Sequence, residues 1–458
     1  MHYPFWYVPG LTAPMLIAAV AVLHIYVALY AVGGGLFLAV ETRHAYRTGN
    51  AAYLAYLRRH AWFFILLTVV YGAITGVGIW WTIGLASPLP TQMLIHLFVF
   101  GWAMEYVFFL IEIVSAFIFY YAWDRLTPRA HQAMAWIYAG SAWMSLVIIT
   151  GITAFMLNPG DWQGDFWRGW ANPQTLPQIV ARTGASLLLA TLYVYVHSSF
   201  WNGPAGLRAM IARRSARPAM AGAVLITLGG LWWHAALPAS AKATLIGAAA
   251  MNLMIALIFA LSVVVFFMFY FGPYRHPEWV SPGFAVLLLL IGYIVTGQAE
   301  FVREAARKPF VIYGEVYSHN IYVSEVPRLK RDGFLDGGVW TRRYVAGRLP
   351  QLVSGGGLDE SRIPSLTEAD QRLIGRTVFM HHCGSCHAAS GYSGMREMLP
   401  GWTPGMLDHL IVNLDRYHFF MPPWSGRPEE ALALRRYLET LASPHPVLPG
   451  AESRGGGA

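Results

Sequence analysis

The sequence predicts an all-α membrane protein, with a bundle of about eight transmembrane helices followed by a small helical domain near the C-terminus. Apolar residues make up 56% of the 458-residue chain and charged residues only 12%, a balance that water-soluble domains of this size do not show. Apolar runs long enough to cross a bilayer recur through about the first 300 residues. The segment beyond them is more polar and contains both cysteines of the chain, Cys383 and Cys386.

Eight apolar runs predict the spans, because a helix of about 20 residues crosses the hydrocarbon core of a bilayer. The sixth run is the weakest, since it is short and contains Gly229 and Gly230. No Lys or Arg occurs in the first eleven residues, and no small-residue cleavage site follows the first run, so we expect that run to stay as an anchor. The runs lie near residues 14–40, 61–85, 92–122, 132–156, 176–200, 219–236, 243–271 and 281–299.

Basic residues alternate between the loops, and this predicts an orientation. The loops after the first, third, fifth and seventh runs hold nearly all of them, whereas the opposite loops hold little beyond Arg168 and Lys242. Loops rich in Lys and Arg stay in the cytoplasm. We therefore expect a multi-pass protein of the cytoplasmic membrane whose N-terminus and C-terminal domain are periplasmic. The basic residues are Arg43, Arg47, Arg58, Arg59, Arg125, Arg129, Arg208, Arg213, Arg214, Arg217 and Arg275.

The chain is expected to divide into a membrane domain at 1–300, a linker at 301–363, a C-terminal domain at 364–445 and a disordered tail at 446–458. The glycine-rich stretch at 354–357 favours a flexible tether within the linker. The formal charge of +8 is explained by the basic loops and a basic stretch at 328–348, and no nucleic-acid-binding motif accompanies it.

The motif that carries chemistry is Cys-x-x-Cys-His at 383–387, the attachment signature of a covalent haem c. Cys383 and Cys386 are spaced so that each thiol can form a thioether to one vinyl group, and His387 can offer its imidazole to the iron. The alternatives are a disulfide or half of a zinc site. No other cysteine exists to complete a four-ligand zinc site, and the adjacent histidine favours haem.

A haem that carries electrons needs a second axial ligand, and Met421 is the natural candidate. It lies about 35 residues downstream in Phe-Phe-Met-Pro-Pro-Trp, where the two prolines favour an extended loop. Met395 and Met398 are the alternatives, because Met380 is too close in sequence to reach the opposite face. A methionine that only fills a small core is the other interpretation of Met421.

The segment at 364–445 resembles a class I cytochrome c. A capped helix is expected before the motif, from the Ser-Leu-Thr-Glu-Ala-Asp stretch at 365–370 to Met380, and a charged amphipathic helix is expected from about Pro428 to Leu441.

Ionisable residues inside the spans are costly and are candidates for function by default. Taken singly, a buried histidine can be a packing residue and a methionine can be filler. Their placement at a similar depth on the outer side favours a site. His197, near the cytoplasmic end of the fifth run, is not expected to be a ligand. The candidates are His24, His96, Glu105, Glu112, His234 and Met254.

Short segments spread over roughly residues 15–320 form a recognisable series in the membrane part. They are 23–25, 37–42, 72–76, 108–112, 123–126, 158–159, 254, 306–310 and 314–316. In these segments the membrane part resembles subunit I of cytochrome bd quinol oxidases. The resemblance implies that His24 is an axial ligand of an active-site haem and that Met254 is one ligand of a low-spin haem b. It also implies that Glu112 and Glu105 match carboxylates near the haem pair and its proton path.

This chain departs from that family in several places. Arg182 aligns with the histidine expected to pair with Met254, and the carboxylate expected on the last span aligns near Gly297. The long loop that oxidises quinol is reduced to about 237–244, and the family's final span is replaced by the C-terminal segments. His96 or His234 could supply the missing ligand. Alternatively, the membrane part holds fewer haems than the family, or none, and is a scaffold for a haem-bearing homologue.

Two functions follow from these expectations. The first is respiratory electron transfer, in which a haem c domain exchanges electrons with haem b or haem d in the membrane domain of a complex that reduces dioxygen or nitric oxide. The second is a non-catalytic anchor that relays electrons between a partner complex and periplasmic cytochromes. Both imply a second membrane subunit or homologue, and a periplasmic cytochrome or other electron carrier, as partners.

Overall fold

The computed structural model describes residues 3–443, and the chain forms two compact units. One unit, here called the bundle, comprises residues 17–84 and 90–314. The other, here called the C-terminal unit, begins at residue 315 and also includes the chain up to residue 16 and the short segment 85–89. The tail expected at 446–458 lies outside the described residues.

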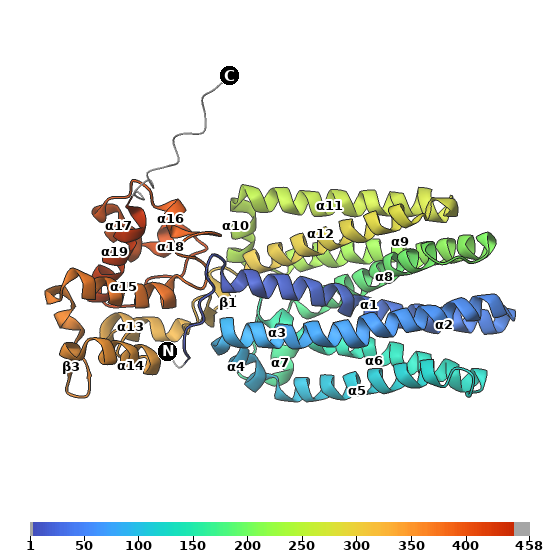
Figure 1. The fold of residues 1–458 in the computed structure, drawn as a ribbon, viewed down its shortest axis with the longest axis horizontal. Helices are drawn as coiled ribbons and strands as arrows, with labels where there is room; N and C mark the ends of the chain where they lie inside the picture. Colours follow the sequence, from blue (N-terminus) through green and yellow to red (C-terminus); the bar gives the residue numbers. More distant parts are fainter. Residues whose placement is uncertain (1–2, 444–458) are drawn as a thin grey trace, which may run out of the picture. The chain divides into compact units, whose positions relative to one another are not determined.

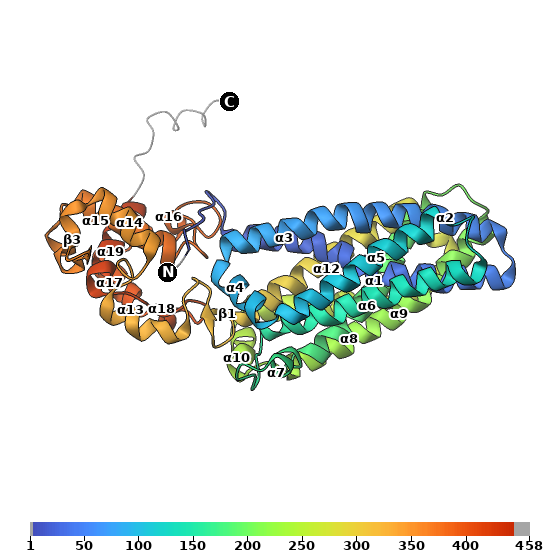
Figure 2. The same ribbon diagram turned by 90° about the horizontal axis from the view of Figure 1, so that it is seen from below.

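Long helices make up the bundle and run alongside one another (Figures 1 and 2). Seven helices in the described part of the chain are long and apolar enough to cross a membrane, or eight if one bent pair counts as a single span. The expectation of about eight spans is confirmed. The helices are α1 (Ala13–Thr48), α2 (Ala51–Ile65), α3 (Gly72–Ala86), α4 (Pro88–Leu97), α5 (Val99–Tyr121), α6 (Pro128–Phe155), α7 (Phe166–Trp170), α8 (Thr175–Ser199), α9 (Ala205–Ala235), α10 (Ala239–Gly247), α11 (Ala249–Phe269) and α12 (Pro282–Arg307).

Several spans differ in detail from the apolar runs. A π-helical stretch, Leu66–Tyr71, joins α2 to α3, so that one span runs from Ala51 to Ala86. The expected third span is broken at Phe98, between α4 and α5. The weak sixth span is the bent pair α9 and α10, whose axes turn by 111°. Hydropathy locates apolar stretches, but it does not show where a helix bends. The short segments that follow are Tyr270–Tyr274 (π-helix), Pro277–Trp279 (3-10 helix) and β1 (Phe310–Ile312).

Small residues let the bundle helices approach closely. A side chain at Gly184 on α8 would place its Cβ 2.6 Å from the carbonyl oxygen of Gly222 on α9. Without a hydrophobic driving force between helices in lipid, such close backbone packing is a main source of association. The interior between the helices is filled largely by aromatic rings, with Tyr30, Tyr53 and Tyr195 fully buried.

The C-terminal unit packs helices around its own core (Figure 1). Helix α15 ends just before the cysteine motif and packs on α19, where a Cβ at Gly375 would collide with the Ala433 carbonyl. The two expected helices are therefore present. The elements are β2 (Val316–Tyr317), α13 (Val326–Asp332), α14 (Val339–Arg348), β3 (Val353–Ser354), β4 (Gly357–Leu358), α15 (Glu368–His382), α16 (Met395–Met398), α17 (Pro404–Val412), α18 (Leu414–Tyr417) and α19 (Pro428–Ala442), with 3-10 turns at Val323–Glu325, Pro350–Leu352 and Glu360–Ser365.

The glycine-rich stretch expected to be a flexible tether instead forms a hairpin turn. Strands β3 and β4 pair antiparallel across Gly355 and Gly356, whose φ angles are 59° and 85°. Two successive positive φ values define the two-residue turn that suits the twist of a hairpin, and glycine adopts them without strain. Glycine here supplies a turn geometry and not flexibility. The boundaries expected between linker and C-terminal domain stay a prediction.

Candidate functional site

The cysteine motif forms a single turn that directly follows α15. The backbone N–H of Cys386 donates to the carbonyl of Cys383 at 3.0 Å, and the N–H of His387 donates to the same carbonyl at 2.8 Å. Residues three and four positions apart on a helical turn share a face. The local backbone therefore brings residues 383, 386 and 387 together on one turn.

The His387 ring is oriented by the loop that follows it. Its Nδ1 lies 3.2 Å from the backbone oxygen of Ser393. A carbonyl can only accept, so Nδ1 carries the proton and the lone pair belongs to Nε2, the nitrogen that can bind a metal. Ser393 lies two residues before the short helix α16. Its φ of 49° is a conformation rare for a non-glycine residue.

The two thiols of the motif are both half-buried. Neither cysteine forms a disulfide. In the described part of the chain, no group of three or more His, Cys, Asp or Glu residues could hold a metal ion. Burial raises the pKa of the Cys383 thiol to about 12, whereas redox-active and metal-binding cysteines are thiolates with lowered pKa values.

The three candidate methionines occupy different surroundings. Met421 is half-buried, and its N–H donates to the carbonyl of His418 at 2.8 Å, which closes a turn just before the two prolines. Met395 is 8% exposed and packs in the core of the C-terminal unit. Met398 is 45% exposed on the surface. Of the three, only Met421 combines partial burial with a place in a loop.

Three histidines of the C-terminal unit adjoin the motif, of which His319 and His382 are buried and His381 is half-buried. The rings of His319 and His382 contact edge to face at 5.5 Å, and His382 also packs on Trp424 at 4.9 Å. Burial lowers the pKa of His319 to about 3 and that of His381 to about 4, so both rings are neutral at neutral pH. The sequence alone did not single out His319, which has no motif around it.

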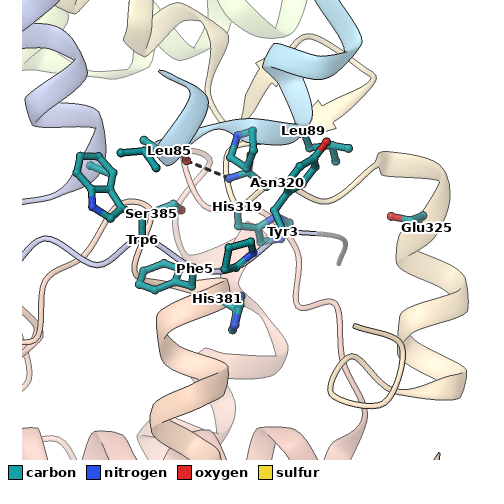
Figure 3. Close-up of a pocket in the computed structure, with 14 residues that line it drawn as sticks. Tyr3, Phe5, Trp6, Leu85, Leu89, His319, Asn320, Glu325, His381 and Ser385 are labelled. Atoms are coloured by element: carbon teal, nitrogen blue, oxygen red, sulfur yellow. Dashed lines mark hydrogen bonds between the residues drawn. The ribbon is translucent and has the colours of Figure 1, made fainter. Parts of the chain in front are cut away.

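A small pocket opens beside these histidines (Figure 3). Asn320 borders it and donates from its side-chain amide to the Ala86 carbonyl at 3.4 Å, while Phe5 packs edge to face on His381 at 5.5 Å. Ser385, between the two cysteines of the motif, also lines the pocket. The N-terminal segment thus covers the turn on which the motif lies.

In the bundle, His24 is oriented by the neighbouring helix α3. Its Nδ1 lies 3.2 Å from the hydroxyl oxygen of Thr75, and that hydroxyl itself donates to the Tyr71 carbonyl at 2.9 Å. Because the hydroxyl proton is engaged, the hydroxyl oxygen accepts, and Nδ1 of His24 is the donor. The lone pair of His24 is then on Nε2, as in an iron ligand. Gly76 faces the ring, since a Cβ there would lie 3.1 Å from Cε1 of His24.

The two carboxylates lie on one face of α5, as their spacing of seven residues predicts. One oxygen of Glu112, Oε1, is buried and makes no well-formed hydrogen bond among the described residues, and the Ser145 hydroxyl is the donor that approaches this carboxyl. Glu105 is half-buried on the same helix. A buried carboxyl oxygen without a well-formed hydrogen bond is costly and marks a functional candidate in a membrane helix.

The remaining candidates are dispersed among the helices. His96, at the end of α4, is exposed, and its Nδ1 lies 2.8 Å from the Gln92 carbonyl of its own helix. His234 is half-buried in the last turn of α9, and Met254 is half-buried on α11. His96, His234 and Met254 thus lie on helices other than α1 and α3, which hold His24 and Thr75.

Arg182 lies where the resemblance implies a histidine ligand. Its guanidinium donates to the Thr150 hydroxyl at 3.1 Å and interacts with the half-buried carboxylate of Glu300, which pairs with Arg303 at 2.7 Å. A guanidinium has no lone pair to offer a metal. The residues present therefore do not fit a low-spin haem held by Met254 and residue 182, in agreement with the departure seen in the sequence.

The comparisons with known proteins concern the membrane part. Residues 13–236 match the family model of cytochrome bd terminal oxidase subunit I. A solved structure, the bd oxidase from Geobacillus thermodenitrificans, superposes with a TM-score of 0.57 at 18% sequence identity, covering 67% of this chain and 89% of that chain. No curated protein matches the chain. The chain is thus a multi-helix membrane protein whose bundle has the fold of bd oxidases, and residues 13–236 are similar to their subunit I.

Proposed function

We propose that this chain is a respiratory electron-transfer subunit of a membrane complex that reduces a small molecule, dioxygen or nitric oxide. In this proposal Cys383 and Cys386 attach a haem c, with His387 and Met421 as axial ligands. His24 ligates a non-covalent haem b or haem d in the bundle. Haem supplies one-electron redox chemistry at its iron.

The observation that carries the proposal is the orientation of two histidines. His387 and His24 each engage Nδ1 in a hydrogen bond that leaves the lone pair on Nε2. Iron-ligating histidines are held in this manner by a second group, which fixes both the tautomer and the ring. The same arrangement at the cysteine motif and in the bundle supports one ligand in each unit.

The bundle also contains carboxyl groups that could transfer protons to the reaction. Reduction of dioxygen to water, or of nitric oxide to nitrous oxide and water, consumes protons, and the buried carboxyl of Glu112 can accept or release one. Glu105, on the same face of α5, interacts electrostatically with Glu112. We assign proton transfer to this pair.

Partners and orientation belong to the same proposal. The basic loops favour a cytoplasmic location for the end of the bundle where α1 meets α2, with the N-terminus and the C-terminal unit in the periplasm. There the C-terminal unit would meet a periplasmic cytochrome or another electron carrier. The similarity to one subunit of an oxidase supports a second membrane subunit or homologue as partner.

Counting the haems tests the proposal. A pyridine haemochrome spectrum of the purified full-length protein separates covalent haem c from non-covalent haem. We expect both, together with oxygen or nitric oxide consumption when an artificial reductant supplies electrons. A purely c-type spectrum would instead support the anchor that only relays electrons, and a spectrum without haem c would refute the assignment of the cysteine motif.

A further inference from the structure

A chain of buried hydrogen bonds links three helices of the bundle. Nε2 of His60 on α2 lies 3.2 Å from the hydroxyl of Tyr30 on α1. Nδ1 of the same ring lies 3.1 Å from Nδ1 of His197 on α8. Tyr30 and His60 are fully buried, and His197 is half-buried. None of these residues is needed as an iron ligand, so their polar atoms require another explanation.

Aromatic packing holds the rings of this chain in place. Tyr193 stacks on Tyr30 with a centroid distance of 4.2 Å, and Phe63 stacks on His197 at 4.9 Å. The hydroxyl of Tyr56 lies 3.4 Å from Nδ1 of His197. Because these contacts restrict ring rotation, the hydrogen-bond geometry does not depend on chance side-chain orientations.

The contact between two Nδ1 atoms permits two proton arrangements. If His60 donates from Nδ1, His197 accepts, and Nε2 of His60 accepts from the Tyr30 hydroxyl. If His197 donates, Nε2 of His60 carries the proton and donates to the Tyr30 oxygen. The two arrangements differ only in the direction of every hydrogen bond. A chain that is satisfied in both directions can pass a proton from one end to the other.

One end of the chain lies near the loop between α8 and α9. His197 is two residues from the end of α8, and Phe200, the next residue after the helix, is 64% exposed. The exposed cation of Arg59 interacts with His197. Because like charges repel, it disfavours a positive charge that stays on His197 or His60. A proton that arrives there is therefore not trapped. The nearby cation Arg214 is neutralised by Glu41, 2.6 Å away.

The other end of the chain leads toward the buried carboxyl of Glu112 on α5. Tyr138 on α6 interacts electrostatically with Tyr30 and, in turn, with Glu112. The ring of Phe64 lies in contact with the rings of both tyrosines, with a centroid distance of 5.3 Å to each. Glu112 is the group at this end with a buried oxygen that makes no well-formed hydrogen bond among the described residues.

We propose that His197, His60 and Tyr30 form a proton relay from the basic-loop end of the bundle toward Glu112. A proton binds Nε2 of His197, whose Nδ1 proton passes to Nδ1 of His60. The Nε2 proton of His60 passes to the Tyr30 oxygen, and the original hydroxyl proton leaves toward Tyr138 and Glu112. One proton enters, one leaves, and no net charge remains. The relay rests on the proposed function, which provides the demand for protons.

Proton uptake on reduction tests the relay without requiring oxygen chemistry. The full-length protein is reduced anaerobically by a photochemical donor in weakly buffered solution, and a pH-indicator dye reports the protons taken up. We expect the uptake rate to fall on the order of 100-fold in His197→Phe and in Tyr30→Phe, because removal of a proton-transfer group costs about that factor. The rate at which the haem is reduced by the donor should stay unchanged.

His131→Phe is the matched control. His131 is as deeply buried as His60, stacks on Phe119 at 4.2 Å and bonds to the Tyr46 hydroxyl, but it lies outside the chain of bonds. It should keep the wild-type rate. Because Tyr30→Phe retains the ring that stacks on Tyr193, it also guards against an effect of misfolding.

The outcomes separate the relay from the function on which it rests. Wild-type uptake rates in His197→Phe and Tyr30→Phe, or a wild-type protein that takes up no proton on reduction, would overturn the relay. A wild-type protein that takes up protons through these residues but consumes neither oxygen nor nitric oxide would refute the proposed function and leave the relay standing.

Discussion

The two units orient their candidate iron-ligating histidines by different means. His387 bonds through Nδ1 to a backbone carbonyl only six residues further along the chain. His24 bonds through Nδ1 to the Thr75 hydroxyl, 51 residues away on another helix. The first arrangement is formed by one turn and one loop, whereas the second exists only when α1 and α3 are packed together.

This difference explains why the site around His387 can be recognised from the sequence and the site around His24 cannot. A local site needs residues at fixed spacing, so Cys-x-x-Cys-His is recognisable as a pattern. A site assembled across helices has no fixed spacing, and its supporting hydroxyl looks like any threonine in a span. We therefore expect the cysteine motif to depend on its own residues, and the bundle site to depend on residues that no motif identifies.

The largest expected effect is the loss of covalent haem when both Cys383 and Cys386 are changed to Ala. Thioether attachment needs the sulfurs, and no other cysteine is available in the chain. Mass spectrometry of the denatured protein should then show the bare polypeptide. Ser385→Ala, between the two cysteines, should keep the attached haem. A covalent adduct in the double variant would show that the local motif is not the attachment site.

The bundle site should lose haem through a residue that never touches the iron. His24→Ala should deplete non-covalent haem almost completely. Thr75→Val removes the hydroxyl that orients His24 and should weaken haem binding about 10-fold to 100-fold, the usual cost of losing such a supporting bond. Haem content of the purified variants is read from the pyridine haemochrome spectrum.

Two matched controls accompany this prediction. Thr82→Val lies on the same helix, and its hydroxyl bonds only to carbonyls of its own helix, at 3.0 Å from Gly78, so haem content should not change. His96→Ala removes an exposed histidine and should also be silent. If Thr75→Val retained full haem content, the supposed dependence of His24 on α3 would be wrong.

A smaller effect is expected at the distal side of the C-terminal unit. Met421→Ala should keep the covalent haem but abolish the sulfur-to-iron absorption band near the red end of the oxidised spectrum. The reduction potential should fall, since a methionine ligand raises it. Met398→Ala, on an exposed side chain, should leave the spectrum as it is. A band that survives in Met421→Ala would move the assignment to Met395.

Much of the fold could be predicted because apolar runs and helix lengths are local properties. The spans were found, and so were the helices on either side of the cysteine motif. The bend of 111° between α9 and α10 was not, because it depends on packing. Composition also does not distinguish a glycine pair that supplies positive φ angles, as Gly355 and Gly356 do, from one that makes the chain flexible.

Less of the candidate site could be predicted. Cys383, Cys386 and His387 follow from a pattern, whereas the partners Ser393 and Thr75 appear only in the folded chain. The chain through His60 was missed for a related reason. A histidine on an apolar helix is ambiguous until its neighbours are known, and its two partners come from helices far apart in the sequence.

The C-terminal unit also depends on contacts between residues far apart in the sequence, because two buried carboxyl groups connect distant segments of it. Glu430, in the first turn of α19, accepts from the backbone N–H groups of Phe334 and Leu335 at 2.8 and 2.7 Å. Glu360 accepts from the N–H of Asp336 at 3.0 Å and lies beside Glu430. Its second oxygen meets no donor among the described residues, so a protonated Glu360 can donate to Glu430.

This pair predicts that the stability of the folded unit falls as pH rises. A carboxylate in a salt bridge, whose pKa is lowered, has the opposite effect. Burial, and then the charge of Glu430, raise the pKa of Glu360 in the folded protein above the value of about 4.3 for an exposed glutamate. The folded state thus holds the proton more tightly than the unfolded state. Its contribution to stability is complete below that exposed value and is lost as pH rises through the raised pKa, by at most about 1.4 kcal/mol per pH unit.

Amide hydrogen exchange at Phe334 and Leu335 measures this smallest of the expected effects. After correction for the intrinsic rate, their protection should fall between about pH 5 and pH 8 in the wild-type protein. Glu360→Gln carries a neutral donor at every pH and should remove the dependence. Glu368→Gln, whose side chain is 61% exposed, should keep it. Equal pH profiles for wild type and Glu360→Gln would mean that this long-range contact does not depend on a shared proton.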